Sequence, residues 1–190
     1  MARTSSTRSR VLGVVIGTLV VAALGVGGFF AWQALNPTTP STPDVEETAA
    51  VSWPRIVSEA ELRAFGAANG PVYWAGPQDG VQYELTITDT GVFYVRYLPA
   101  GAELGEPSDD FLTVATYPNI DGYDNLVQAG VREGATSTVT QGGALIVTTP
   151  EAPLSTYFSF EGLGFQVEVY APGEGESFSL VEDGTVEILQ

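Results

Sequence analysis

Hydrophobic positions follow two different patterns along this chain of 190 residues, and a polar segment separates them. Near the N-terminus an uncharged, mostly apolar run extends from Val11 to Leu35, and three basic residues precede it: Arg3, Arg8 and Arg10. At about 1.5 Å per residue, a helix of this length spans roughly 37 Å, enough to cross a hydrocarbon core of ~30 Å. The first pattern therefore predicts a transmembrane helix over residues 11–35.

The residues that flank this run predict its orientation. Basic flanks stay in the cytoplasm, so residues 1–10 are expected to form a cytoplasmic tail and the C-terminal domain to lie outside the plasma membrane. Trp32 stands at the outer end of the run, where aromatic side chains meet the lipid headgroups. The alternative is a cleaved secretory signal peptide, whose apolar core is usually only ~7–15 residues long. We therefore expect a retained signal anchor and a single-pass protein held in the lipid bilayer.

The polar segment over residues 36–52 contains a run of Pro, Thr and Ser, from Pro37 to Pro43. This composition is typical of an extended, semi-rigid spacer. The remaining residues, 53–190, have the usual size of one domain and can bury a hydrophobic core. The chain is thus expected to carry one extracytoplasmic domain on a spacer.

In this domain, short segments of alternating apolar and polar residues predict strands joined by tight turns. The clearest case pairs residues 81–88 with residues 92–98 through the turn Asp89-Thr90-Gly91, in which glycine suits a positive φ. The same alternation, or a short apolar run between Pro and Gly, predicts further strands over residues 71–77, 112–117, 136–140, 144–149, 156–160, 165–170 and 185–189.

Two segments have helical signals. Ser58 and Glu61 have the spacing of a capping box and predict a short helix after Ser58. A main helix is predicted over residues 120–133, where apolar residues follow the helical period: Tyr123, Leu126, Val127, Gly130 and Val131. Residues 174–182 are ambiguous between a short helix and a loop. The expected class is α+β: a transmembrane helix, then a largely antiparallel, β-rich sheet of six to eight strands with one main helix packed on it.

Charge and composition exclude several functions. From residue 44 onward the chain has 23 acidic residues and four arginines, a formal charge of −19. This argues against nucleic acid as a partner, since nucleic acid needs basic patches. The chain has no Cys, His or Lys, so it lacks disulfides, thiol chemistry, imidazole bases and Schiff-base chemistry. Neither a cofactor motif nor a metal-binding motif is present, and we expect no enzyme activity.

The aromatic residues of the first half of the domain are the best candidates for a ligand or partner surface. Aromatic side chains on a sheet face can stack on sugars or anchor a protein, and Arg96 can hold a carboxylate. The other interpretation is that the aromatics fill the core and that Arg96 forms a structural ion pair with Glu84 on the paired strand. The candidate surface consists of Tyr73, Trp74, Tyr94 and Arg96.

Acidic pairs offer two weaker alternatives. The pairs Asp109-Asp110 and Asp121/Asp124 are candidate calcium ligands, but no compact calcium-binding loop surrounds them. Asp121 and Asp124 also suit the N-terminus of the helix that they open. A carboxylate-based hydrolase acting on cell-wall glycans needs two acids at a defined separation, which the sequence does not specify. A signalling sensor would have to act through a partner, because the cytoplasmic tail is short.

The chain resembles uncharacterised actinobacterial single-pass proteins that carry one extracytoplasmic α+β domain. The resemblance covers most of the domain and rests on five segments: Pro71 to Pro77, Tyr83 to Thr86, Val92 to Pro99, Phe111 to Pro118, and Phe165 to Pro172. It implies a cell-envelope location and one intact domain, and it assigns no functional residue. We therefore expect a membrane-tethered binding module that contacts an envelope protein or a wall component.

Overall fold

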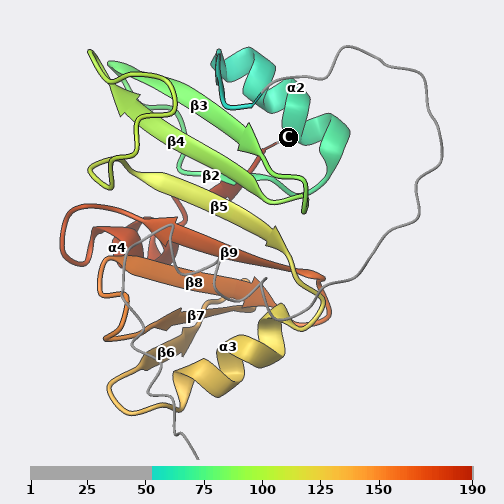
Figure 1. Ribbon diagram of the computed structural model, residues 1–190. Coiled ribbons are helices and arrows are strands. Elements are labelled where there is room, and N and C mark those ends of the chain that lie inside the picture. The colour runs from blue at the N-terminus through green and yellow to red at the C-terminus, as the bar shows by residue number, and fades with distance from the viewer. Residues whose placement is uncertain (1–52, 190) are drawn as a thin grey trace, which may run out of the picture.

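The computed structural model of the chain describes residues 53–189. Its main feature is an eight-stranded sheet in which every neighbouring pair is antiparallel, in the order β1-β3-β4-β5-β9-β8-β7-β6 (Figure 1). The strands are β1 (Arg55–Val57), β3 (Val81–Ile87), β4 (Phe93–Pro99), β5 (Thr113–Pro118), β6 (Thr136–Val139), β7 (Ala144–Thr148), β8 (Ser155–Phe160) and β9 (Phe165–Tyr170).

Three helices and a small ribbon pack against this sheet. The helices are α2 (Glu59–Asn69), α3 (Gly122–Gly130) and α4 (Glu176–Glu182). The ribbon pairs β2 (Tyr73–Trp74) with β10 (Glu187–Ile188), so that the end of the domain meets its beginning. The fold is therefore α+β with a mostly antiparallel sheet, as the sequence predicts.

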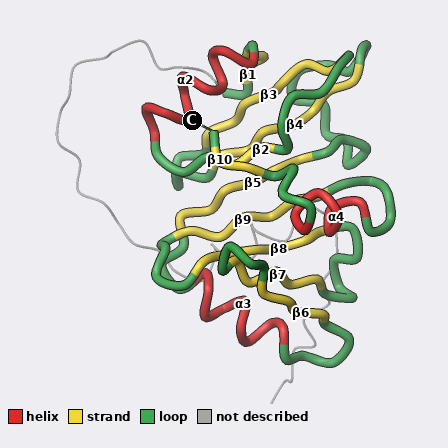
Figure 2. The backbone as a smooth tube through the Cα atoms, turned by 180° about the vertical axis from the view of Figure 1, so that it is seen from behind, coloured by secondary structure: helices red, strands yellow, loops and turns green. Residues whose placement is uncertain are grey.

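The two faces of the sheet are covered differently. The inner face carries Leu85, Val95, Val114 and Val167, and α2, the β2–β10 ribbon and α4 pack on it to form the largest apolar core (Figure 2). The outer face carries the residues that alternate with the inner-face residues along each strand. Helix α3 packs on this outer face over β7, β8 and β9. Among the described residues, no helix covers the outer face of β3, β4 and β5 (Figure 1).

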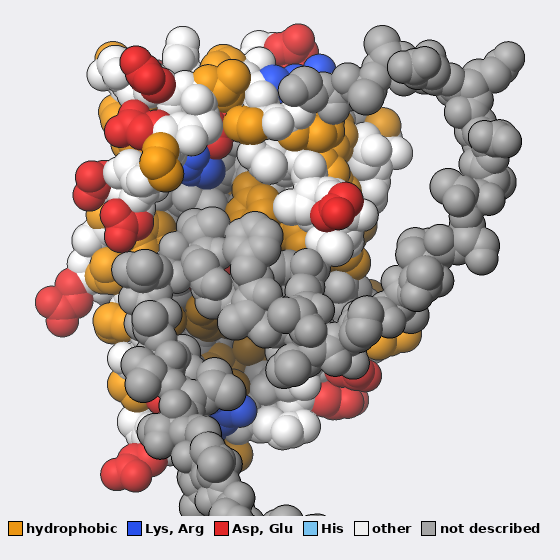
Figure 3. All heavy atoms as spheres, in the orientation of Figure 1, with side chains coloured by type: hydrophobic (Ala, Val, Ile, Leu, Met, Phe, Trp, Pro, Cys, Tyr) orange, Lys and Arg blue, Asp and Glu red, His pale blue; other side chains and the backbone are white. Residues whose placement is uncertain are grey.

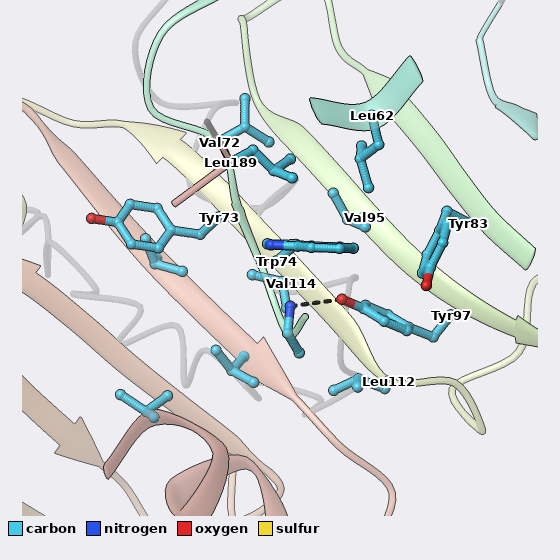
Figure 4. Packing of buried hydrophobic residues seen from close by; sticks show 14 of the residues in the cluster. Leu62, Val72, Tyr73, Trp74, Tyr83, Val95, Tyr97, Leu112, Val114 and Leu189 are labelled. Carbon is cyan, nitrogen blue, oxygen red and sulfur yellow. Dashed lines mark hydrogen bonds between the residues drawn. The ribbon is translucent and has the colours of Figure 1, made fainter. Parts of the chain in front are cut away.

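Trp74 lies at the centre of the inner core and is completely buried (Figure 4). Its ring meets the ring of Tyr83 edge-on, and the guanidinium of Arg63 lies 4.7 Å from the centre of the Trp74 ring. Next to it, the hydroxyl of Tyr97 accepts a hydrogen bond from the backbone N–H of Ala75 at 2.7 Å (Figure 4). Burial raises the pKa of Tyr97, so its hydroxyl stays protonated and also donates a hydrogen bond to the carbonyl oxygen of Gly76 at 3.0 Å.

Helix α3 lies close to the sheet because glycines stand at its two ends. A Cβ atom at Gly122 would lie 3.0 Å from the carbonyl oxygen of Phe165, and one at Gly130 would lie 2.8 Å from the Cβ of Ser137. Only Leu126, between these glycines, is a large buried side chain of the helix. The contact of α3 with the sheet therefore depends as much on absent side chains as on apolar ones.

The structure confirms the predicted hairpins and the capping box. Strands β3 and β4 pair with Tyr83 opposite Tyr97, and β6–β7 and β8–β9 form the two later hairpins. Ser58 caps α2, with the Glu61 side chain accepting a hydrogen bond from the backbone N–H of Ser58 at 2.8 Å. The ambiguous segment over residues 174–182 forms helix α4 over most of its length.

Several details of the prediction are wrong. The helix predicted over residues 120–133 covers only Gly122–Gly130, and α2 is longer than this helix. Three helices therefore pack on the sheet, and none of them is the single main helix that was expected. Val127 and Val131 are exposed, because the helix ends at Gly130 and glycines make the sheet contact. Only two residues of each strand expected over 71–77 and 185–189 form a strand, β2 and β10. Strand β1 was not predicted, because three residues are too few to show an alternating pattern.

No helix within residues 53–189 has the length and apolar character needed to cross a membrane. The predicted anchor over residues 11–35 and the spacer over residues 36–52 lie outside the described residues, as do the anchor's flanking residues Arg3, Arg8, Arg10 and Trp32.

Candidate functional site

The four residues of the predicted surface do not lie on one surface. Tyr73 and Trp74 belong to the inner core: Tyr73 is 9% exposed and packs edge-on against Phe158, and Trp74 is fully buried. Tyr94 and Arg96 lie on the outer face, on the other side of the sheet. The interpretation that aromatics fill the core is therefore right for Tyr73 and Trp74, and a joint surface of all four residues does not form.

Arg96 holds its own chain together. Its guanidinium forms an ion pair with the carboxylate of Glu84 at 2.8 Å, on the strand where the alternative interpretation placed that partner. The same guanidinium donates to the backbone carbonyl oxygens of Glu106 and Ser108 at 2.8 and 3.0 Å, and it lies 5.1 Å from the ring centre of Phe111. Arg96 thus fixes the loop between β4 and β5 and is not available to a ligand.

Tyr94 lines a small pocket on the outer face. It is half-buried on the outer face, and its ring stands edge-on to that of Tyr117, with 6.1 Å between the ring centres. The pocket has a free volume of about 20 Å³, which holds about one water-sized group. Its walls come from β4, β5, β9 and the β4–β5 loop: Tyr94, Ser108, Asp109, Thr113, Ala115, Tyr117, Glu168 and Tyr170.

Glu168 supplies the charge of this pocket, and hydroxyl groups hold it in place. Its carboxylate accepts hydrogen bonds from Tyr117 at 2.7 Å, from Ser155 at 2.8 Å and from Tyr157 at 3.0 Å. A carboxylate has about four acceptor positions, so three donors leave room for about one more. The tyrosine-lined pocket, as we call the space between Tyr94, Tyr117, Tyr170 and Glu168, therefore has a fixed anionic group at its wall.

The tyrosine hydroxyls of this region stay neutral. Burial, followed by the nearby negative charge of Glu168, raises the pKa of Tyr117 and of Tyr157. Burial also raises the pKa of Tyr94, with a smaller contribution from Glu168, and burial with Asp109 and Asp110 raises that of Tyr170. These hydroxyls act as hydrogen-bond donors rather than as nucleophiles or bases, and the local potential is negative.

Such an arrangement suits a small cation. Aromatic rings attract a cation through their π faces, and a partly desolvated carboxylate forms strong, charge-assisted hydrogen bonds with N–H donors. In the part of the outer face that Figure 3 shows, acidic side chains stand mostly along the edges, and basic atoms are visible in only a few places. Within residues 53–189, no group of three or more Asp and Glu side chains has the arrangement of a metal site. The pairs Asp109-Asp110 and Asp121/Asp124 therefore do not belong to such a group.

The sequence did not reveal Glu168 as part of a site. The alternation of apolar and polar residues places Glu168 on the same side of strand β9 as Tyr170. Its contact with Tyr117, however, requires β5 to pair with β9, which lies about 50 residues later in the chain. Nothing local predicts that pairing. The aromatic-rich strand with Tyr94 was the only visible signal.

Comparison with models of protein families, with curated proteins and with solved structures found no match to this chain.

Proposed function

We propose that this protein is a membrane-tethered extracytoplasmic binding module of the cell envelope. The support for the tether is the sequence: a basic flank, an apolar run long enough for one span, and a Pro/Thr-rich spacer. In this proposal residues 11–35 anchor the protein in the plasma membrane, residues 1–10 are cytoplasmic, residues 36–52 form the spacer and residues 53–190 form the domain outside. An actinobacterial cell envelope remains the proposed setting.

The tyrosine-lined pocket is the observation that supports a binding role. We propose that it receives a primary ammonium group, such as a lysine side chain of an envelope protein or a free amine of a wall component. An ammonium group is about the size of a water molecule, so it fits a free volume of about 20 Å³. Its N–H groups can reach the remaining acceptor position of Glu168, while Tyr94 and Tyr170 surround it.

Composition supports an external source for this cation. The chain has no lysine, so none of its side chains can supply an ammonium group to the pocket. Arg96, on the same strand as Tyr94, is committed to Glu84 and to the β4–β5 loop. The pocket is therefore open to a cation that another molecule brings.

The test is a titration of the full-length protein in lipid nanodiscs with Nα-acetyl-lysine amide, followed by NMR. One charge-assisted hydrogen bond and a cation–π contact correspond to a Kd of about 1 mM. Tyr94→Ala and Glu168→Gln are each expected to weaken binding about tenfold. Asp124→Asn, which removes one charge from α3, is the matched control and should leave binding unchanged.

A neutral analogue, with the side-chain amine acetylated, decides the outcome. If it binds as well as the lysine derivative, or if Tyr94→Ala and Glu168→Gln both bind like the unmodified protein, the pocket does not recognise an ammonium group. Near-UV circular dichroism of each variant shows whether the core around Trp74 is intact. The hydrolase acting on cell-wall glycans stays the alternative, although Glu168 already uses three acceptor positions on its own chain.

A further inference from the structure

The open edge of the sheet at β6 has an unusual lack of charge. All four residues of β6 are exposed, and within residues 53–189 this strand pairs only with β7, on one of its two sides. No charged residue occurs between Gly134 and Pro150, although the chain from residue 44 onward carries a formal charge of −19. Native proteins commonly protect an open edge with charged side chains, because its free N–H and C=O groups can pair with another strand. The β6 edge lacks this protection.

The turn before β7 determines which backbone groups of β6 are free. The N–H of Thr140 donates to the carbonyl of Ala144 at 2.9 Å, and the N–H of Gly143 donates to the carbonyl of Thr140 at 3.0 Å. In an antiparallel pair, hydrogen-bonded and non-hydrogen-bonded positions alternate. Counting back from Thr140, Thr138 faces β7, and the backbone groups of Ser137 and Val139 point to the open edge.

A groove lies on the inner face beside this edge. It has a volume of about 600 Å³, and its floor is apolar, with Ala144, Ile146, Phe158 and Phe160. Its near wall is β6 with the turn that follows, where Thr138 and Thr140 have short side chains. Its far wall is the end of α4, where Glu182 and Asp183 are exposed. Hydrogen bonds from Thr185 lower the pKa of Asp183, so this rim keeps its negative charge at neutral pH.

We propose that the β6 edge and this groove bind an extended peptide segment in which basic and apolar residues alternate. The peptide pairs as an additional strand with the free backbone groups of Ser137 and Val139. Its long basic side chains cross the short threonines, with their methylene groups over the apolar floor and their charges toward Glu182 and Asp183. This site lies on the opposite face from the tyrosine-lined pocket and is independent of it.

Charge favours this occupant over a second copy of the chain. A second copy would add another strongly acidic surface, and its own β6 carries only Thr, Ser and Val, which do not fill the groove. A basic peptide instead has charge complementary to the rim, and association steered by charge is fast.

The test uses the full-length protein in lipid nanodiscs and a synthetic peptide of seven residues that alternates Arg and Val. Amide hydrogen exchange at Ser137 and Val139 is expected to slow when the peptide is present. Val139→Pro removes a free N–H without breaking the pairing with β7, and we expect about fivefold weaker binding, equivalent to one net hydrogen bond. Val139→Thr keeps the N–H and is the matched control.

The charge of the groove is tested separately. Thr138→Arg places a positive charge at the groove, and we expect about tenfold weaker binding because like charges repel. Thr90→Arg, the same change on the exposed β3–β4 turn, should bind within about twofold of the unmodified protein. The Glu168→Gln background separates this site from the tyrosine-lined pocket, since binding at β6 should be unchanged there.

Three results would overturn the inference. The first is equal binding of a peptide with Glu in place of Arg. The second is binding without protection of Ser137 and Val139. The third is a protein that sediments as a dimer, returns to a monomer with Val139→Pro, and does not bind the peptide, which would assign the edge to a second copy.

Discussion

Removal of the Arg96 side chain should destabilise the domain strongly, because Arg96 is the partner of a buried charge. Glu84 is 1% exposed. In Arg96→Met the Glu84 carboxylate loses its ion-pair partner and keeps the hydrogen bond from the backbone N–H of Gly105 at 2.6 Å. The variant also removes the donors to the carbonyl oxygens of Glu106 and Ser108. Breaking a buried ion pair by removing one partner costs about 3–5 kcal/mol, a large part of a total stability of roughly 5–15 kcal/mol.

At ~3 °C per kcal/mol for a domain of this size, the expected loss is about 9–15 °C in Tm. The assay is thermal unfolding of the full-length protein in detergent micelles, followed by near-UV circular dichroism. Glu59→Gln is the control, since its ion pair with Arg63 is about 40% exposed and should contribute less than ~1 kcal/mol. Replacing both Glu84 and Arg96 by apolar residues should recover much of the loss. If Arg96→Met unfolds within ~1 kcal/mol of the unmodified protein, the ion pair does not support the loop as argued.

Two further predictions concern close packing and pH. Gly66→Ala should destabilise the domain by ~1–3 kcal/mol in urea unfolding, because the new Cβ would lie 2.4 Å from the Cβ of Leu189. Gly142→Ala is the control and should be near neutral, because its new Cβ would lie at an ordinary contact distance of 3.7 Å from Oγ1 of Thr140. Burial raises the pKa of Tyr97, Tyr117 and Tyr157 above 10, so their contribution to stability is complete below pH 10 and is lost as the pH rises through their folded-state values. The three together should lower the unfolding free energy by ~4 kcal/mol per pH unit above pH 10. The 295 nm absorbance that these three tyrosines contribute, obtained as the difference from Tyr→Phe variants at each position, should appear only with unfolding; a gradual rise of this share in the folded protein would contradict the prediction.

The sequence predicts the local parts of this fold and misses the parts that depend on distant contacts. The pairing of β3 with β4 follows from alternation and a three-residue turn, and it places Arg96 opposite Glu84. The pairing of β5 with β9 joins residues about 50 positions apart and is not encoded in any local pattern, so the pocket around Glu168 could not be predicted. For the same reason Trp74 and Tyr94, equally aromatic in sequence, could not be assigned to opposite faces.

The distribution of arginines connects the two proposed binding sites. From residue 44 onward the chain has four arginines and no lysine, and three of the arginines contact their own domain: Arg55 over the Trp53 ring, Arg63 with Glu59 and Trp74, and Arg96 with Glu84. These internal uses leave few basic groups to neutralise the acidic surface, so a cation at either site has to come from another molecule. Because both sites are open to solvent, binding at each should weaken as salt rises from 0.05 to about 0.5 M, where the screening length falls below ~5 Å. The buried pair of Glu84 and Arg96 is screened much less, so the unfolding free energy should change little over the same range. Salt therefore separates charge used for binding from charge used for folding in this domain.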